Sequence, residues 1–238
     1  MNMEQPKYRR ILLKLSGEAL AKGGSGIVNE AFVEEVAKVL KRCLSAGVEI
    51  GIIVGAGNIW RGRQGVDMDP TRADSMGMLA TAINAIALED AFVRFGIDAH
   101  AMTAVEMSRF AEPFVRDRAI EYLKKGSVVI FGCGLGIPFL STDTAAVVRA
   151  AEIGADIVLM AKNVDAIYTA DPVKDPTARR LESISCREIL EKQLHALDST
   201  ATAFCMDHAI PVLAFGLSDP ENIYRAVMGE PIGTVITP

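Results

Sequence analysis

The sequence predicts an α/β fold in which a mostly parallel β-sheet is covered by helices on both faces. Short apolar runs typical of buried strands alternate along the chain with longer segments whose apolar residues recur at helical spacing. Several of these runs lead directly into glycine-containing turns, as strands do when helices connect them in a parallel sheet. No repeat, low-complexity tract or linker interrupts the alternation, so a single domain spanning residues 1–238 is predicted.

The individual elements follow from the periodicity of the apolar residues. Strands are predicted at residues 11–15, 48–54, 97–102, 128–131, 157–160, 212–215 and 234–236. Helices are predicted from a cap at Asn29 to Gly47, and at residues 74–95, 114–125, 142–153, 186–194, 199–208 and 220–228. The segment from residue 161 to about residue 180 is predicted to be rich in loops.

Composition argues against several functional classes. Half of the residues are apolar, which supplies a core, and the formal net charge is −5 at pH 7. No basic stretch is long enough to follow a nucleic-acid backbone, so we expect no nucleic-acid partner. The four cysteines, Cys43, Cys133, Cys186 and Cys205, form no C-x-x-C pair. Their spacing argues against a zinc site or a disulfide framework, and we expect no metal site built by the protein alone.

Neither a membrane span nor a secretion signal is predicted. The longest apolar run, residues 128–140, is broken by Gly132, Gly134, Gly136 and Pro138 and is too short to cross a bilayer. The first ten residues are polar and lack the apolar core of a signal peptide. We therefore expect a cytoplasmic protein without a membrane partner.

The predicted helix at residues 74–95 differs from the others. Apolar residues such as Met76, Leu79, Ile83 and Phe92 cover most of its circumference. A helix that is apolar all round is usually buried on all sides. Because a domain of this size cannot cover every face of such a helix, we expect it to lie in a subunit interface of a homo-oligomer.

Three glycine-bearing turns follow predicted strands, at residues 16–17, 55–58 and 132–136. In open parallel sheets, ligands bind outside the carboxyl ends of the strands. Glycine lets backbone N–H groups approach phosphate oxygens closely, and a following helix adds its positive N-terminus. Any one turn could simply be a tight connection, but three at one sheet edge favour phosphate binding. Neither the P-loop motif nor the Rossmann glycine motif is present, which disfavours P-loop kinases and dehydrogenases.

An acidic protein with an anionic substrate must concentrate positive charge locally, and Lys14, Arg61 and Arg63 are candidates for that role. Lys14 ends an otherwise apolar strand, where its ammonium either extends to solvent or faces a phosphate. Arg61 lies just past the second glycine turn, and the ordinary alternative for it is a solvated surface charge.

Three polar residues stand near predicted helix starts. Asp74, Thr142 and Asp143 could each be a plain helix cap, which is the commoner use of such residues. The three histidines show no spacing pattern and are interpreted as structural.

Taken together, these segments resemble the bacterial uridylate kinases of the amino-acid-kinase family over essentially the whole chain. The resemblance lies in residues 11–20 (ILLKLSGEAL), 55–58 (GAGN) with Arg61 and Gly62, 74–81 (DSMGMLAT), 138–143 (PFLSTD), 164–172 (VDAIYTADP) and 225–230 (RAVMGE). One such motif would be weak support, whereas the set in this order is specific. The resemblance implies a carbamate-kinase-like three-layer sandwich.

The resemblance also implies a function, which is the ATP-dependent phosphorylation of UMP to UDP in pyrimidine nucleotide synthesis. It implies Mg²⁺ bound with ATP, a homohexamer, activation by GTP and inhibition by UTP. It assigns to ATP the residues Lys14, Leu15, Ser16, Gly17, Gly57, Arg61, Asn163, Tyr168 and Asp171. It assigns to UMP the residues Ala56, Asp74, Leu135, Gly136, Ile137, Pro138, Phe139, Leu140, Ser141 and Thr142.

The expected chemistry agrees with these residues. Phosphoryl transfer depends on positioning and charge neutralisation more than on a protein nucleophile. We therefore expect Lys14 and Arg61 to offset charge on the transferred group, with Asp143 orienting Lys14 or a metal-bound water. The carboxylate of Asp74 would repel phosphate and suits a ribose hydroxyl.

Two departures from the family pattern leave other functions open. Ala56 replaces the middle one of three glycines, and Leu135 and Ile137 replace a threonine and an asparagine of the nucleobase loop. The apolar pair cannot hydrogen-bond a base through its side chains. The alternatives are a kinase of the same fold that acts on a carboxylate or carbamate, and a non-catalytic nucleotide-loaded storage or regulatory protein.

Overall fold

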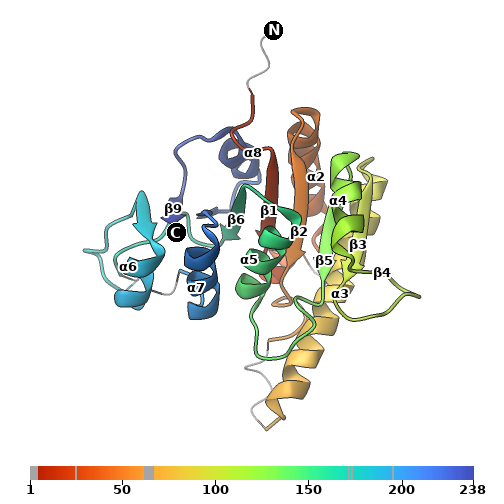
Figure 1. Cartoon of the computed structure of the whole chain (residues 1–238), viewed down its shortest axis with the longest axis horizontal. Coiled ribbons are helices and arrows are strands. Elements are labelled where there is room, and N and C mark those ends of the chain that lie inside the picture. The colour runs from red at the N-terminus through yellow and green to blue at the C-terminus, as the bar shows by residue number, and fades with distance from the viewer. Residues whose placement is uncertain (1–4, 25, 62–66, 171, 173, 195) are drawn as a thin grey trace.

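A computed structural model describes residues 5–24, 26–61, 67–170, 172, 174–194 and 196–238. They form one nine-stranded sheet in the order β4-β3-β5-β2-β1-β6-β8-β9-β7 (Figure 1). The strands are β1 (Arg10–Leu15), β2 (Glu49–Val54), β3 (Ala99–Thr103), β4 (Glu112–Pro113), β5 (Val128–Gly132), β6 (Ile157–Lys162), β7 (Ser183–Ser185), β8 (Val212–Gly216) and β9 (Thr234–Thr237). All neighbouring strands pair in parallel except β8 and β9, which are antiparallel.

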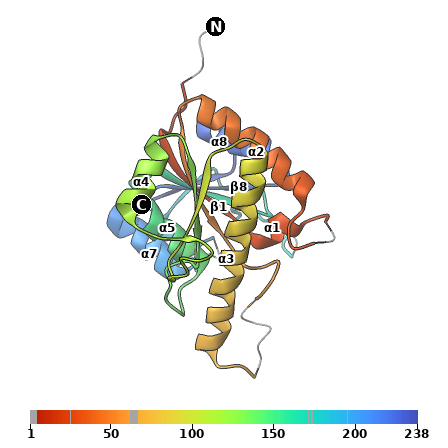
Figure 2. The ribbon, with the colours of Figure 1, turned by 90° about the vertical axis from the view of Figure 1, so that its right-hand side faces the viewer.

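The helices cover both faces of this sheet (Figure 2). They are α1 (Gly17–Ala21), α2 (Glu30–Ser45), α3 (Pro70–Arg94), α4 (Arg116–Lys124), α5 (Thr142–Ile153), α6 (Cys186–Glu191), α7 (Ser199–His208) and α8 (Glu221–Met228). Helices α2, α3 and α8 contribute to one apolar core, and α4, α5, α6 and α7 contribute to the other. The predicted α/β class with a mostly parallel sheet is therefore confirmed.

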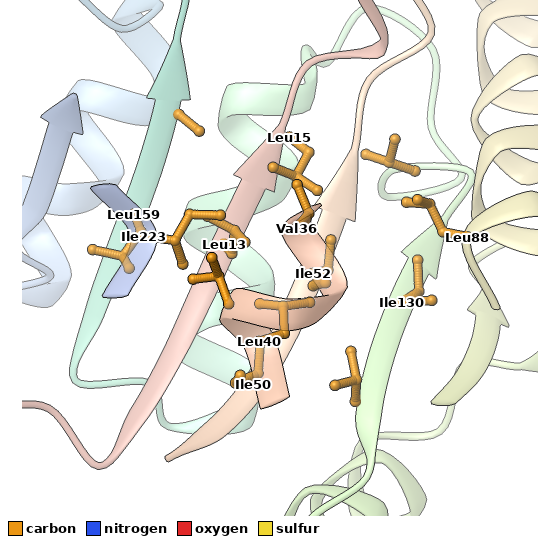
Figure 3. Close-up of a cluster of buried hydrophobic side chains, with 14 of the residues drawn as sticks. Leu13, Leu15, Val36, Leu40, Ile50, Ile52, Leu88, Ile130, Leu159 and Ile223 are labelled. Carbon is orange, nitrogen blue, oxygen red and sulfur yellow. The ribbon is translucent and has the colours of Figure 1, made fainter. Parts of the chain in front are cut away.

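The two cores follow from the alternation of side chains along each strand. Leu13 and Leu15 of β1 point into the core beneath α2 and α8, where they meet Leu40 and Ile223 (Figure 3). Leu12 has the opposite parity and belongs to the core beneath α5. Lys14 has the same parity as Leu12, so its side chain lies on the α5 face of the sheet.

The predicted positions of most elements agree with the structure, and α5 and α7 have the predicted bounds. Helix α3 begins at Pro70, four residues earlier than predicted, because the Asp69 side chain caps it and proline suits its first position. The interpretation of Asp74 as a helix cap is therefore wrong. Strands β4 and β7 and the short helix α1 were not predicted, since each is at most five residues long.

Helix α3 is long and apolar enough, by length and composition, to cross a membrane. It instead packs along β3 and β5, and Leu88 and Phe92 are fully buried in the core beneath it. Its other side leaves Leu79 54% exposed and Ile83 48% exposed. Helix α3 is thus apolar on two faces, one of which is buried in the core while the other is exposed in a single chain.

Candidate active site

The strand order brings the three predicted ligand turns together. Strands β5, β2, β1 and β6 are consecutive neighbours and run in parallel, so their carboxyl ends share one edge of the sheet. The three glycine turns follow β1, β2 and β5 at that edge. This edge is where open parallel sheets bind ligands.

Lys14 and Asp143 form an ion pair at this edge, with 3.0 Å between Nζ and Oδ1. Asp143 lies in the first turn of α5, which is capped by the hydroxyl of Ser141 and not by Thr142 or Asp143. Both charged side chains are mostly shielded, at 16% and 20% exposure. The cap alternatives for Thr142 and Asp143 are therefore wrong, and Lys14 does not simply extend to solvent.

A second lysine, Lys162, stands at the end of β6 and was missed in the sequence. It has the same parity as Met160, which pairs with Lys14 in the sheet register, so both lysines lie on the α5 face. Burial lowers the pKa of Lys162, and the nearby Lys14 charge acts in the same direction, whereas Asp143 and Asp198 oppose both. The sequence signal was a lysine ending a long apolar strand, but the strand was predicted to stop at residue 160.

The segment around Asp198 contacts both α5, which carries Asp143, and β6, which carries Lys162. Asp198 caps α7 and accepts hydrogen bonds from the hydroxyls of Ser141 and Thr144 at the start of α5. The ammonium of Lys162 donates to the carbonyl of Ala196, which precedes Asp198 by two residues. Sequence reasoning did not single out Asp198, because an aspartate before a helix is ordinarily only a cap.

The first two glycine turns pack directly against each other. A Cβ atom at Gly17 would come within 2.7 Å of the Gly55 carbonyl oxygen, so only glycine allows this approach. Ser16 caps α1 through its hydroxyl, and Gly17 is the first residue of that helix. Arg61 pairs with Glu18 over 2.6 Å across the two turns. Arg63 lies outside the described residues.

One cavity, of about 300 Å³, opens beside the second and third turns. Among the residues expected to bind UMP, it is lined by Ala56, Asp74, Ile137, Leu140, Ser141 and Thr142. Trp60, Met78 and Thr81 also line it and were not predicted. The carboxylate of Asp74 accepts the N–H of Phe139 over 2.7 Å, so it fixes the loop that closes the cavity.

The other residues expected at UMP lie elsewhere around this loop. Gly136, Pro138 and Phe139 do not line the cavity, and Phe139 is 71% exposed. Leu135 packs against the core beneath α5. Of the two apolar replacements noted in the nucleobase loop, only Ile137 therefore faces the cavity.

A second cavity, of about 470 Å³, lies beyond β6 and is mostly apolar. Lys162, Val164, Ile167, Tyr168 and Leu194 contribute to its walls. Of the residues expected to bind ATP, Tyr168 lines this cavity, whereas Asn163 is exposed and does not. Asp171 lies outside the described residues. A flat aromatic ring such as a purine, whose faces are apolar, suits a cavity of this character.

Both cavities adjoin the charged cluster of Lys14, Asp143 and Lys162. Thr142, which lines the first cavity, precedes Asp143, and Lys162 lines the second and lies close enough to Lys14 and Asp143 to be affected by their charges. Two fixed ammonium groups beside glycine-rich turns can stabilise negative charge that develops between ligands in the two cavities. The arrangement suits group transfer between two anionic ligands.

Comparison with known proteins identifies the family of this site. The sequence profile described as the amino acid kinase family matches residues 9–215. The chain belongs to the amino acid kinase family. This confirms the family that the sequence motifs indicated.

Solved structures of the family superimpose on this chain over almost its full length. It is similar to the UMP kinase from Bacillus anthracis, with 33% identity and a TM-score of 0.92, over 97% of this chain and 96% of that one. It is also similar to the UMP kinase from Ureaplasma parvum, with 32% identity and a TM-score of 0.91, over 99% and 100%. The uridylate kinase from Archaeoglobus fulgidus matches at 27% identity and a TM-score of 0.75, over 95% and 99%.

Proposed function

We propose that this protein is a nucleoside monophosphate kinase that transfers the γ-phosphoryl group of ATP to UMP. The observation that carries the proposal is the Lys14–Asp143 ion pair with Lys162 beside it at the glycine-rich sheet edge, where Lys162 lines one cavity and Thr142, next to Asp143, lines the other. The similarity to solved UMP kinases supports the choice of substrate.

In this proposal the adenosine of ATP occupies the apolar cavity lined by Tyr168, and its phosphates extend across Lys162 toward Lys14. The backbone N–H groups of Ser16, Gly17 and Gly57 and the side chain of Arg61 contact the phosphates. Lys14 and Lys162 stabilise the charge on the transferred group, and Asp143 holds Lys14 in place. No protein nucleophile is required, because UMP itself supplies the attacking oxygen.

UMP occupies the cavity lined by Asp74, with its phosphate toward Lys14 and its ribose at the carboxylate. Asp74 has one oxygen bonded to the Phe139 N–H, and its other oxygen is suited to accept a ribose hydroxyl. The uracil lies along the wall formed by Ile137 and Trp60. Trp60 is fixed there because its indole N–H donates to the Ala73 carbonyl over 2.9 Å.

Mg²⁺ is proposed to enter with ATP. The described residues include no group of three or more His, Cys, Asp or Glu side chains that could hold a metal by themselves. Mg²⁺ commonly retains several waters and binds through substrate phosphates with one or two carboxylates, and Asp143 is the carboxylate best placed for this. The ion would neutralise charge on the ATP phosphates.

The exposed face of α3 supports a homo-oligomer, and the family resemblance extends this to a hexamer. Met76, Leu79, Ile83 and Val93 are each at least 37% exposed along this helix. Such a run of large apolar side chains on one surface helix is typical of a subunit interface. Activation by GTP, inhibition by UTP, the pyrimidine pathway and a cytoplasmic location are proposed from the resemblance.

A coupled assay with MgATP and a panel of acceptors tests the proposal. The panel contains UMP, CMP, dUMP, AMP and GMP, together with carbamate and amino-acid carboxylates as acceptors for other kinases of this fold. UMP is expected to be the best acceptor, with UDP and ADP formed in equal amounts. Transfer only to a carboxylate or carbamate would replace this function with the first alternative, and binding of nucleotides without any transfer would favour a storage or regulatory protein.

A further inference from the structure

Asn84 is a fully buried amide in the middle of α3. Its Nδ2 donates to the Gly55 carbonyl over 2.7 Å and to Oδ1 of Asn58 over 2.8 Å. Asn58 returns a hydrogen bond from its own Nδ2 to Oδ1 of Asn84 over 2.9 Å. The two amides therefore form a reciprocal pair that joins α3 to the turn after β2.

The turn that Asn84 holds is packed tightly between other parts of the site. Asn58 also donates to the Ile27 carbonyl over 2.7 Å, and the Gly55 N–H donates to the Leu15 carbonyl over 2.9 Å. Gly17 lies directly against Gly55 and Asn58, with no room for a Cβ. The position of Asn58 thus sets how the first and second glycine turns lie relative to each other.

We infer that Asn84 is a positioning residue, which fixes the turn at residues 55–58 and through it the backbone N–H groups offered to the transferred phosphate. The inference rests on the proposed function, which places phosphates at this turn. Asn84 lines neither of the two cavities, so it acts through Gly55 and Asn58 and not by touching a ligand.

The presence of an amide at this position supports a role in positioning the turn. Asn84 lies among buried apolar side chains of α3 that include Ala80, Ala85 and Leu88. A buried polar group contributes little net stability even when its hydrogen bonds are made, and an apolar residue of similar size would serve a purely packing role. An amide, in contrast, supplies two donors and an acceptor in fixed directions, which determine one conformation of the turn.

The test compares Asn84→Ala, Asn58→Ala and the double variant with a control, Ser127→Ala. Ser127 is also buried and donates to Asp98, but it lies at the opposite edge of the sheet, before β5. Two quantities are measured well below the unfolding temperature of every variant. These are kcat and KM for UMP phosphorylation, and hydrogen–deuterium exchange in a peptide spanning residues 54–60.

Each single variant of the amide pair is expected to lower kcat by ~10- to 100-fold through misplacement of the turn, with a much smaller change in KM. The double variant is expected to lose less kcat than the product of the two single losses, because both changes break the same pair. The turn peptide should exchange faster in all three variants and not in Ser127→Ala.

Unchanged exchange of the turn peptide in Asn84→Ala, or a kcat equal to that of Ser127→Ala, would overturn the inference. So would losses that simply multiply in the double variant. If Asn84→Ala does not fold, Asn58→Ala probes the same pair from the partly exposed side. A wild type that folds but does not phosphorylate UMP would contradict the proposed function, while the exchange result would still decide whether Asn84 fixes the turn.

Discussion

Asp74 and Phe139 are joined by a hydrogen bond although 65 positions separate them in the chain. The bond ties α3 to the loop between β5 and α5, at the cavity proposed for UMP. Phe139 adopts a φ of 69°, a conformation that costs a non-glycine residue energy and persists only where the surroundings hold it. The carboxylate of Asp74 is one of those constraints.

Two substitutions of Asp74 separate its hydrogen bond to the Phe139 loop from its proposed contact with the ribose of UMP. Asp74→Asn keeps an oxygen that can accept the Phe139 N–H, so it loses mainly the charge offered to the ribose. Asp74→Ala also releases the loop. We expect KM for UMP to rise in both, by ~10-fold or more in Asp74→Ala, because a polar group of the substrate is left without its partner. Steady-state kinetics with both substrates checks this, and an increase confined to KM for ATP would place Asp74 at the wrong ligand.

Lys162 gives a prediction about stability and pH. Its pKa is lowered by burial, so its charged form disfavours folding, and this cost is largest below the folded-state pKa. As pH rises from that lowered pKa toward the ordinary value of 10.5, the wild type should gain stability that Lys162→Met does not gain. Urea unfolding of both proteins across the alkaline range checks the sign.

At neutral pH, Lys162→Met should therefore unfold no more easily than the wild type, yet lose most of its kcat. Lys192→Met is the matched control, because Lys192 is an exposed lysine at the end of α6 whose ion pair, among the described residues, is with Glu188 of the same helix. Its kcat should stay at the wild-type value. A Lys162→Met variant with normal kcat would remove Lys162 from the proposed chemistry.

Ile137 is predicted to govern base selection, because it is the apolar replacement that faces the cavity. A site that hydrogen-bonds its substrate can reject an analogue lacking the group by ~10⁴-fold, and an isoleucine side chain cannot impose that penalty. UMP should remain the best substrate through backbone groups of the loop, with CMP used measurably. dUMP has the same base as UMP and differs only in the ribose, so its use reports on the contact proposed for Asp74. UTP, which presents the same base, should inhibit only weakly.

Ile137→Asn should increase the ratio of kcat/KM for UMP over CMP, whereas Leu135→Thr should chiefly lower stability, since Leu135 packs against the core. The comparison uses kcat/KM for UMP, CMP and dUMP in each variant. Complete exclusion of CMP by the wild type, unchanged in Ile137→Asn, would show that the base is read elsewhere.

The exposed face of α3 predicts an oligomer that a single charge disrupts. Ile83→Asp should lower the molecular mass measured by sedimentation, because burying an unpaired carboxylate in an apolar interface is strongly unfavourable. Met206→Asp on α7, also a change at an exposed apolar helix position, should leave the mass unchanged. A wild type that sediments as a stable, active monomer would contradict the interface.

The sequence predicted the structure correctly where the local pattern of residues alone determines which element forms. The apolar strands and glycine turns predicted the central parallel strands, and Lys14 followed from its place at a strand end. Asp74 shows where pattern fails, because a helix start was assigned four residues late and its real partner, Phe139, is distant in the chain. Position relative to a helix cannot reveal a hydrogen bond made across the fold.

Lys162 and Asp198 show a second limit. Lys162 belongs to the site only because β6 lies next to β1, and strand order is not encoded in the spacing of one segment. Asp198 reads as an ordinary cap, and its contacts to Ser141 and Thr144 depend on how α7 packs against α5. Both contributions arise from tertiary packing.

Phosphorus NMR of the protein mixed with MgATP and UMP follows the transfer of the phosphoryl group from ATP to UMP directly, with Lys14→Met as the matched variant. The γ-phosphate signal of ATP should decay as the β-phosphate signal of UDP grows at the same rate. Lys14→Met should remain folded and slow this transfer by ~10²- to 10³-fold, as loss of one charge-stabilising group does elsewhere. Formation of inorganic phosphate without UDP would contradict transfer to UMP, and an undiminished rate in Lys14→Met would contradict the role of Lys14 in that transfer.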